Sequence, residues 1–212
     1  METAPVDTPL TELVPPETQT RRRARPGERR LQILQCLAGM LEDGGAERVT
    51  TAALAQRLQV SEAALYRHFA SKAQMFEALI EFIEHSMFGL VNQIAAQQES
   101  GLTQAARIVQ ALVAFAEQNP GLCRVMAGDA LVGEHARLRQ RVDQFFARIE
   151  STLRQCLRTA VEQGHASAGF DPAQRAQWLL TFACGGVLRV ARAPGGPALS
   201  STIDRALHAL LR

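Results

Sequence analysis

Three helix start signals fall close together in the stretch RVTTAALAQRLQVSEAALYRHFASK, from Arg48 to Lys72. Thr50 and Ser61 can each cap a short helix, because a side-chain hydroxyl accepts from the unpaired N–H groups of a first turn. Ser71 and Gln74 have the spacing of a capping box at a third start. Short helices with such brief connections must meet at steep angles. The stretch therefore predicts a helix-turn-helix unit, whose second helix can enter the major groove of DNA.

The segment VSEAALYRHFASKAQMF resembles the signature of TetR-type transcription regulators, in which a recognition helix ends in L-Y-x-H-F and a lysine opens the next helix. This resemblance implies that Tyr66, His68 and Lys72 hold DNA phosphates. Lys72 fits that role because a lysine in a first turn opposes the helix dipole unless an anion is present. Singly, these residues could be packing or solvated side chains, but the whole set favours DNA contact. Gln59 stands where glycine is usual, and a left-handed conformation there would cost about 1 kcal/mol, which favours a slightly different turn and tilt of the second helix.

The expected DNA contacts lie at the helix starts, on the second helix of the motif and in a basic run that precedes the first helix. They are Thr50, Thr51, Ser61, Glu62, Ala63, Tyr66, Arg67, His68, Lys72, Arg21, Arg22, Arg23 and Arg25. Four of them are candidates for reading bases, namely Ser61, Glu62, Ala63 and Arg67. Arg67 could either pair with guanine or hold a phosphate. The basic run is either a solvated charge cluster or an arm that reaches the DNA backbone or minor groove.

The net charge of +2 is unevenly distributed along the chain. Residues 1–20 hold four acids and no base, whereas residues 21–72 hold ten bases and five acids. The remaining residues, 73–212, carry a net charge of only +1. Positive charge therefore lies on and beside the predicted DNA-binding unit, where phosphate neutralisation requires it.

Hydrophobic periodicity predicts an all-α fold in three parts. Residues 1–25 are expected to be a disordered tail with a basic arm, residues 26–72 a three-helix DNA-binding domain, and residues 73–212 a larger dimerisation and regulatory domain. The resemblance implies a TetR-like arrangement with about nine helices. The helices are expected over about 26–42, 52–58, 62–68, 71–94, 102–118, 122–131, 134–163 and 172–191, with a last one capped by Ser201. The last two are apolar enough to form a homodimer interface, and Gly185-Gly186 could pack within the subunit or across that interface.

Several functional classes are not expected. No run approaches the roughly 18 apolar residues of a membrane span, and the first residues lack the pattern of a secretory signal. The four cysteines are far apart and the five histidines form no metal set or catalytic triad, so we expect no metal, no cofactor and no enzyme activity. A cytoplasmic location is expected from these features.

Longer segments look closely like the nucleoid occlusion factors of proteobacteria, a group within the TetR family. They include NPGLCRVMAGDAL and RVDQFFARIESTLRQCLR, and the similarity extends over about residues 28–160. It implies a nucleoid-associated dimer on specific chromosomal sites that binds the C-terminal tail of the division GTPase FtsZ. The tail would lie in a groove between the helices expected at 71–94 and 102–118.

Five residues are implied in that groove. Phe82 and Asn119 match residues that the group uses there, whereas Leu90, Ala114 and Gln118 stand where its best-known member has other residues, including arginines. Phe82 could also be a peripheral core residue, because it lies at the edge of an apolar stripe. The alternative function is that of most TetR-type proteins, a repressor that a small-molecule ligand releases from its operator.

Overall fold

The computed structural model describes residues 27–43, 49–167 and 169–212. These residues confirm the all-α prediction, since every regular element among them is a helix. The elements are α1 (Glu28–Glu42), α2 (Thr51–Arg57), α3 (Glu62–Tyr66), α4 (Lys72–Ala95), α5 (Gly101–Gln118), α6 (Pro120–Met126), the 3-10 helix η2 (Asp129–Leu131), α7 (Ala136–Glu162), α8 (Pro172–Arg192) and α9 (Ile203–Leu210).

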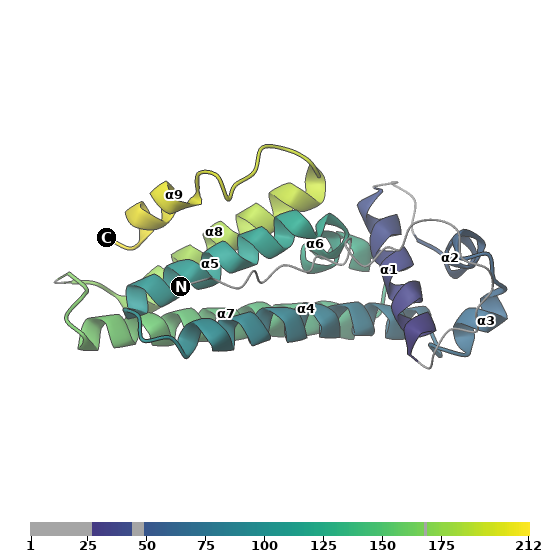
Figure 1. Ribbon diagram of the computed structural model, residues 1–212, viewed down its shortest axis with the longest axis horizontal. Coiled ribbons are helices and arrows are strands. Elements are labelled where there is room, and N and C mark those ends of the chain that lie inside the picture. Colours follow the sequence, from purple (N-terminus) through teal and green to yellow (C-terminus); the bar gives the residue numbers. More distant parts are fainter. Residues whose placement is uncertain (1–26, 44–48, 168) are drawn as a thin grey trace, which may run out of the picture.

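The molecule is elongated, with a small head at one end and a body of long helices behind it (Figure 1). Helices α1, α2 and α3 form the head. In the body, α4 and α7 run lengthwise beside each other, with α5 and α8 packed along them and α9 lying against α8. The long helix α4 begins at the head and extends the length of the body, so it connects the two parts directly.

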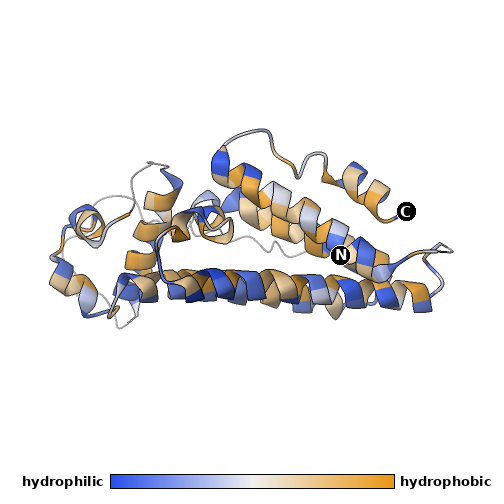
Figure 2. Ribbon diagram, turned by 180° about the vertical axis from the view of Figure 1, so that it is seen from behind, coloured by the Kyte–Doolittle hydropathy of each residue, from blue (hydrophilic) through white to orange (hydrophobic). Residues whose placement is uncertain are grey.

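Amphipathic sequence patterns explain how these helices pack. In α4 the residues Met75, Leu79, Ile83, Met87 and Val91 recur every four positions, and all of them are buried. Such spacing forms an apolar stripe along one side of a helix. Hydrophobic and hydrophilic residues are accordingly interspersed along each of the long helices (Figure 2).

The head is packed against the body through α1 and α6. A side chain at Gly121 would place its Cβ only 2.1 Å from the carbonyl oxygen of Ala38, so glycine permits the two backbones to touch. Arg124 strengthens this junction, because its Nη1 donates to the carbonyl oxygen of Leu41 at 3.1 Å. Helix α1 is therefore covered by a helix of the body, across the boundary predicted at residue 72.

Two predicted helices differ from the observed ones. A single helix was expected over 122–131, but α6 begins at Pro120 and η2 follows after a break at Gly128, whose φ is 83°. Proline is well suited to a first helical position, and a left-handed glycine ends a helix. The last helix begins at Ile203 without a side-chain cap, because the Ser201 hydroxyl donates to the carbonyl oxygen of Ala198 instead.

The other helix ends agree with the predicted ones to within about two residues. The predicted start of the first helix at Pro26 lies outside the described residues. Across the parts of the chain that the structure describes, no helix combines the length and apolarity needed to cross a bilayer.

Candidate DNA-binding surface

The predicted helix caps form the frame of the helix-turn-helix unit. The Thr50 hydroxyl accepts from the N–H of Ala53 at 3.1 Å, and the Ser61 hydroxyl accepts from Ala64 at 3.3 Å. Ser71 caps α4 by accepting from the N–H of Gln74 at 3.2 Å. The Gln74 side chain reaches back to the N–H of Ala70, one residue before the N-cap position that an ideal capping box pairs. All three predicted starts are therefore confirmed.

The turn between α2 and α3 has the left-handed conformation that the glycine pattern requires. Gln59 has a φ of 54° and is the one residue other than glycine with positive φ in the described ranges. Because its Cβ crowds the backbone there, this conformation costs about 1 kcal/mol relative to glycine. The turn thus keeps the geometry of the motif despite the departure in sequence.

Two of the expected DNA contacts bind each other. The Thr51 hydroxyl donates to Oε2 of Glu62 at 2.7 Å, which joins the start of α2 to the first turn of α3. Glu62 also lies at the positive end of α3, where a carboxylate is favourable. The structure thus gives Thr51 and Glu62 a framework contact, while their contact with DNA stays a prediction.

The outer side of α3 is open to solvent. Tyr66 is 46% exposed, and Ser61, Ala63, Arg67 and His68 are exposed as well. On the inner side, Leu65 and Phe69 are buried and hold the helix to the head. The exposed residues belong to one short helix with its flanking positions, so the structure brings them together at the end of the molecule farthest from the body.

Arg30 supports this surface, and it was missed by the sequence analysis. Its Nη1 donates to the carbonyl oxygen of His68 at 2.9 Å, and its guanidinium carbon lies 4.0 Å from the centre of the Phe69 ring. A cation at that place offsets the negative end of α3. Sequence reasoning had no signal for it, because the bonded residues are 38 positions apart.

Lys72 has a protein partner rather than a free ammonium group. Its Nζ donates to Oε1 of Glu134 at 2.6 Å and lies 5.5 Å from the centre of the Phe76 ring. Glu134 is in the connection that leads into α7, on the body. The anion expected at the start of α4 is thus a carboxylate in this structure. The basic run at Arg21, Arg22, Arg23 and Arg25 lies outside the described residues.

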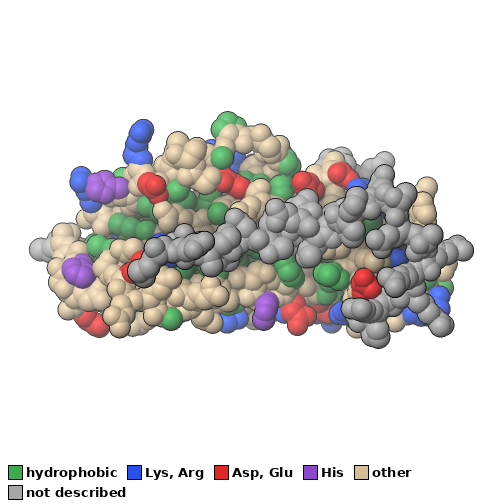
Figure 3. Space-filling view, in the orientation of Figure 1, with side chains coloured by type: hydrophobic (Ala, Val, Ile, Leu, Met, Phe, Trp, Pro, Cys, Tyr) green, Lys and Arg blue, Asp and Glu red, His purple; other side chains and the backbone are tan. Residues whose placement is uncertain are grey.

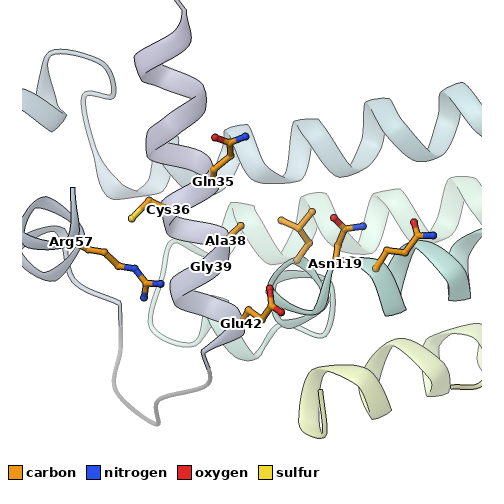
Figure 4. A pocket seen from close by; sticks show the side chains of 10 residues that line it. Gln35, Cys36, Ala38, Gly39, Glu42, Arg57 and Asn119 are labelled. Atoms are coloured by element: carbon orange, nitrogen blue, oxygen red, sulfur yellow. The ribbon is translucent and has the colours of Figure 1, made fainter. Parts of the chain in front are cut away.

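The five residues of the implied peptide groove separate into two sets. Phe82, Leu90 and Ala114 are half-buried on α4 and α5, and Phe82 and Leu90 pack against the body's core. Gln118 and Asn119 instead line a hollow of about 270 Å³ between α1 and the junction of α5 with α6 (Figure 4). Asn119 is only 8% exposed, and its Nδ2 donates to the carbonyl oxygen of Phe115 at 2.9 Å.

A second hollow lies between α5 and α9. Its floor is apolar, with Leu102, Ala106 and Leu207, and hydrophobic side chains are visible at the surface beside α9 (Figure 3). Arg107 and Asp204 stand at its rim. Both hollows are open to solvent rather than closed inside the body.

Among the described residues, no three His, Cys, Asp or Glu side chains lie close enough to hold a metal ion. Burial raises the pKa of the Cys123 thiol to about 12 and that of Cys184 to about 11. Both thiols are therefore protonated and weakly nucleophilic near neutral pH.

Comparisons with known proteins agree with this geometry. Residues 33–79 match the model of bacterial regulatory proteins of the tetR family, and residues 99–195 match the SlmA-like type of tetracyclin repressor-like C-terminal domain. The chain is 49% identical over 164 residues to the nucleoid occlusion factor SlmA of Idiomarina loihiensis, covering 77% of this chain and 84% of that protein. It is 53% identical over 141 residues to the nucleoid occlusion factor SlmA of a Marinomonas species, covering 66% of this chain and 72% of that protein.

Solved structures share the fold at lower identity. The TetR family transcriptional regulator PfmR of Thermus thermophilus superposes with a TM-score of 0.72 and 23% identity, covering 85% of this chain and 97% of that one.

Proposed function

The chain belongs to the TetR family and, within it, to the group of the nucleoid occlusion factor SlmA, and from this premise we propose that it is a DNA-binding nucleoid occlusion factor. In this proposal a homodimer binds specific chromosomal sites and, while bound, engages the C-terminal tail of FtsZ to oppose division over the nucleoid. The observation that carries the proposal is identity near one half over both the head and the body, 49% across 164 residues.

DNA binding is supported by the outward side of α3 and by charge. Arg67 and His68 are exposed beside Tyr66, at the tip of the head. Residues 21–72 carry a net charge of +5, from ten bases and five acids, so positive charge is concentrated in the part of the sequence that contains the helix-turn-helix unit. Contacts between basic side chains and DNA phosphates would provide affinity. Contacts from Ser61, Ala63 or Arg67 to the bases would provide sequence specificity.

A homodimer is supported by the surface of α8. Trp178 is 41% exposed, Phe182 is half-buried, and together with Gly185 they line a shallow apolar hollow. A Cβ at Gly186 would meet Leu199 of the same chain at 3.0 Å, whereas one at Gly185 would meet nothing within 4 Å. Gly186 thus packs within the subunit and Gly185 is available for a partner helix. Two-fold pairing would set two recognition helices about one turn of DNA apart.

The peptide groove has more limited support. Phe82 is half-buried on α4, which leaves part of its ring accessible to an apolar side chain. Leu90 and Gln118 carry no positive charge, so an acidic tail would gain fewer ion pairs than in relatives with arginines there. We expect apolar contact at Phe82 to contribute more than electrostatics.

Selection of bound sequences from random duplexes tests the DNA-binding proposal. We expect recovery of a two-fold symmetric site, because a symmetric dimer places equal heads on equal half-sites. Lys72→Ala should weaken binding to all duplexes and reduce the slope of log affinity against log salt by about one phosphate per subunit. If the selection recovers duplexes with no common sequence, or if Lys72→Ala leaves the salt dependence of binding unchanged, the proposed contacts are contradicted.

A peptide copying the FtsZ tail tests the partner. It should bind the DNA-loaded dimer, and Phe82→Ala should weaken this binding about ten-fold, as expected for an apolar anchor. Phe88→Ala is the matched control, since Phe88 is half-buried on the same helix but packs against α7, with its ring 5.5 Å from that of Phe145. It should leave peptide binding unchanged. If no peptide binds and a small molecule releases the DNA, the protein is a ligand-released repressor instead.

A further inference from the structure

Three ion pairs join α4 to α7 and to the residues just before it. Glu77 binds Arg137 at 2.7 Å and Glu84 binds Arg141 at 2.6 Å. In both of these pairs the acid belongs to α4 and the base to α7. The third pair, Lys72 with Glu134 at 2.6 Å, has the opposite polarity and lies nearest to the head.

The Lys72–Glu134 pair is also the best shielded of the three. The two side chains are 25% and 14% exposed, whereas Arg137 and Glu77 are 52% and 31% exposed. Electrostatic attraction is screened less where solvent is partly excluded. Glu134 lies two residues before the first residue of α7, where the positive end of that helix favours a carboxylate. Lys72 is the first residue of α4, so the dipole of its own helix favours an anion beside it.

We propose that Glu134 is an intramolecular competitor of DNA, which holds the Lys72 ammonium until a phosphate replaces it. This inference rests on the proposed DNA-binding function and assigns a regulatory role to a residue of the body. A phosphate oxygen that binds Lys72 must approach the place where the Glu134 carboxylate now lies. Two anions cannot share one ammonium without repulsion, so DNA binding and the ion pair oppose each other.

The connection that carries Glu134 contains two glycines. Gly128 and Gly133 precede it with φ of 83° and 74°, conformations that other residues rarely adopt. They flank η2, and Glu134 is held in the connection by its own N–H, which donates to the carbonyl oxygen of Leu131 at 3.1 Å. By linkage, DNA weakens the pair by the same factor as the pair weakens DNA binding. Occupancy of the head is thereby communicated to the start of α7.

A double-mutant cycle on the full-length protein tests the competition, with the selected duplex as the probe at about 0.1 M salt. Glu134→Gln keeps the size of the side chain and removes its charge, and we expect it to bind DNA about five-fold more tightly, the range for a partly exposed ion pair. In a Lys72→Met background the same Glu134→Gln change should have no effect. Glu77→Gln, which breaks the neighbouring pair, should stay within about two-fold of the parent protein.

The outcomes separate the inference from the function on which it rests. If the parent protein binds no duplex, the proposed function fails and the competition fails with it. If the parent binds but Glu134→Gln binds equally or more weakly, Glu134 is not a competitor. A gain that persists without Lys72, or that Glu77→Gln reproduces, would reflect general repulsion of DNA by acids and would also overturn the inference. Circular dichroism of each variant should match the parent, because Glu134→Gln, Glu77→Gln and Lys72→Met each keep a side chain of similar size.

Discussion

Alanine in place of Gly121 should lower the free energy of unfolding by about 3 kcal/mol, although it adds a single methyl group. The added Cβ would lie 2.1 Å from the carbonyl oxygen of Ala38, 3.0 Å from its carbonyl carbon and 3.2 Å from the N–H nitrogen of Glu42. These atoms belong to the backbone of α1, so no side-chain rotation can relieve the overlap. Helix α1 must move away from α6.

Thermal or urea unfolding measures this loss, and Gly39→Ala is the matched control. Gly39 lies on α1, next to Ala38, and a Cβ there would meet nothing within 4 Å. Alanine at this helical position should therefore raise the free energy of unfolding by about 0.5–1 kcal/mol. Equal stability of the two variants would show that α1 and α6 do not approach as closely as described.

The Gly121 change should also alter DNA binding, because α1 sets the position of the head. The guanidinium of Arg30 on α1 supports the end of α3 through the carbonyl oxygen of His68. A displaced α1 would move both recognition helices of the proposed dimer relative to their expected half-sites. Part of any loss of DNA binding in Gly121→Ala will come from unfolded protein. We expect the measured affinity for the selected site to fall by more than this unfolded fraction explains.

Leucine in place of Gly185 should separate the proposed dimer and thereby reduce affinity for a two-half-site duplex about 100-fold. The position is exposed on α8 next to the apolar side chains of Trp178 and Phe182, and a Cβ there has open space within the subunit. The leucine therefore costs the single subunit little. It would, however, prevent a partner helix from packing closely against α8, and two linked heads bind a duplex far more tightly than one.

Sedimentation measures the subunit association, and binding to one-half-site and two-half-site duplexes measures the consequence. Gly89→Leu is the control, because Gly89 is also an exposed helical glycine with nothing within 4 Å, but it lies on α4. That variant should remain a dimer with parental affinity. A Gly185→Leu protein that still sediments as a dimer would place the subunit interface on another surface.

The sequence predicted local features well, because their causes lie within a few residues. Thr50, Ser61 and Ser71 cap the helices that they were expected to cap, since each hydroxyl reaches an N–H three positions ahead. The apolar side chains of α4 are buried for a similar local reason. Their spacing along the sequence matches the turn of a helix, so they lie along one side of it. At Gln59, by contrast, the departure from glycine favoured a slightly different turn, but the structure keeps the left-handed conformation.

Contacts between distant residues were not predictable in this way. The sequence identified Lys72 as a side chain in need of an anion, but Glu134 is 62 positions away and came to it only through the packing of α4 against α7. Thr51 and Glu62 were assigned to DNA singly, whereas the fold joins them to each other. Asn119 stays a predicted groove residue, but its burial beside α1 could not be read from the sequence.

Sequence alone thus determined the helical fold, the starts of the DNA-binding helices and, through resemblance, the family. The helical fold and the helix starts depend on the spacing of apolar and capping residues along the sequence, because each such residue acts on neighbours a few positions away. Only the tertiary structure decided that Gly121 lets α1 touch α6, that Gly185 faces outward while Gly186 packs inward, and that Lys72 is held by a carboxylate of the body. Such contacts depend on how helices pack in three dimensions, and a side chain does not reveal from its own sequence neighbourhood which distant group it will meet.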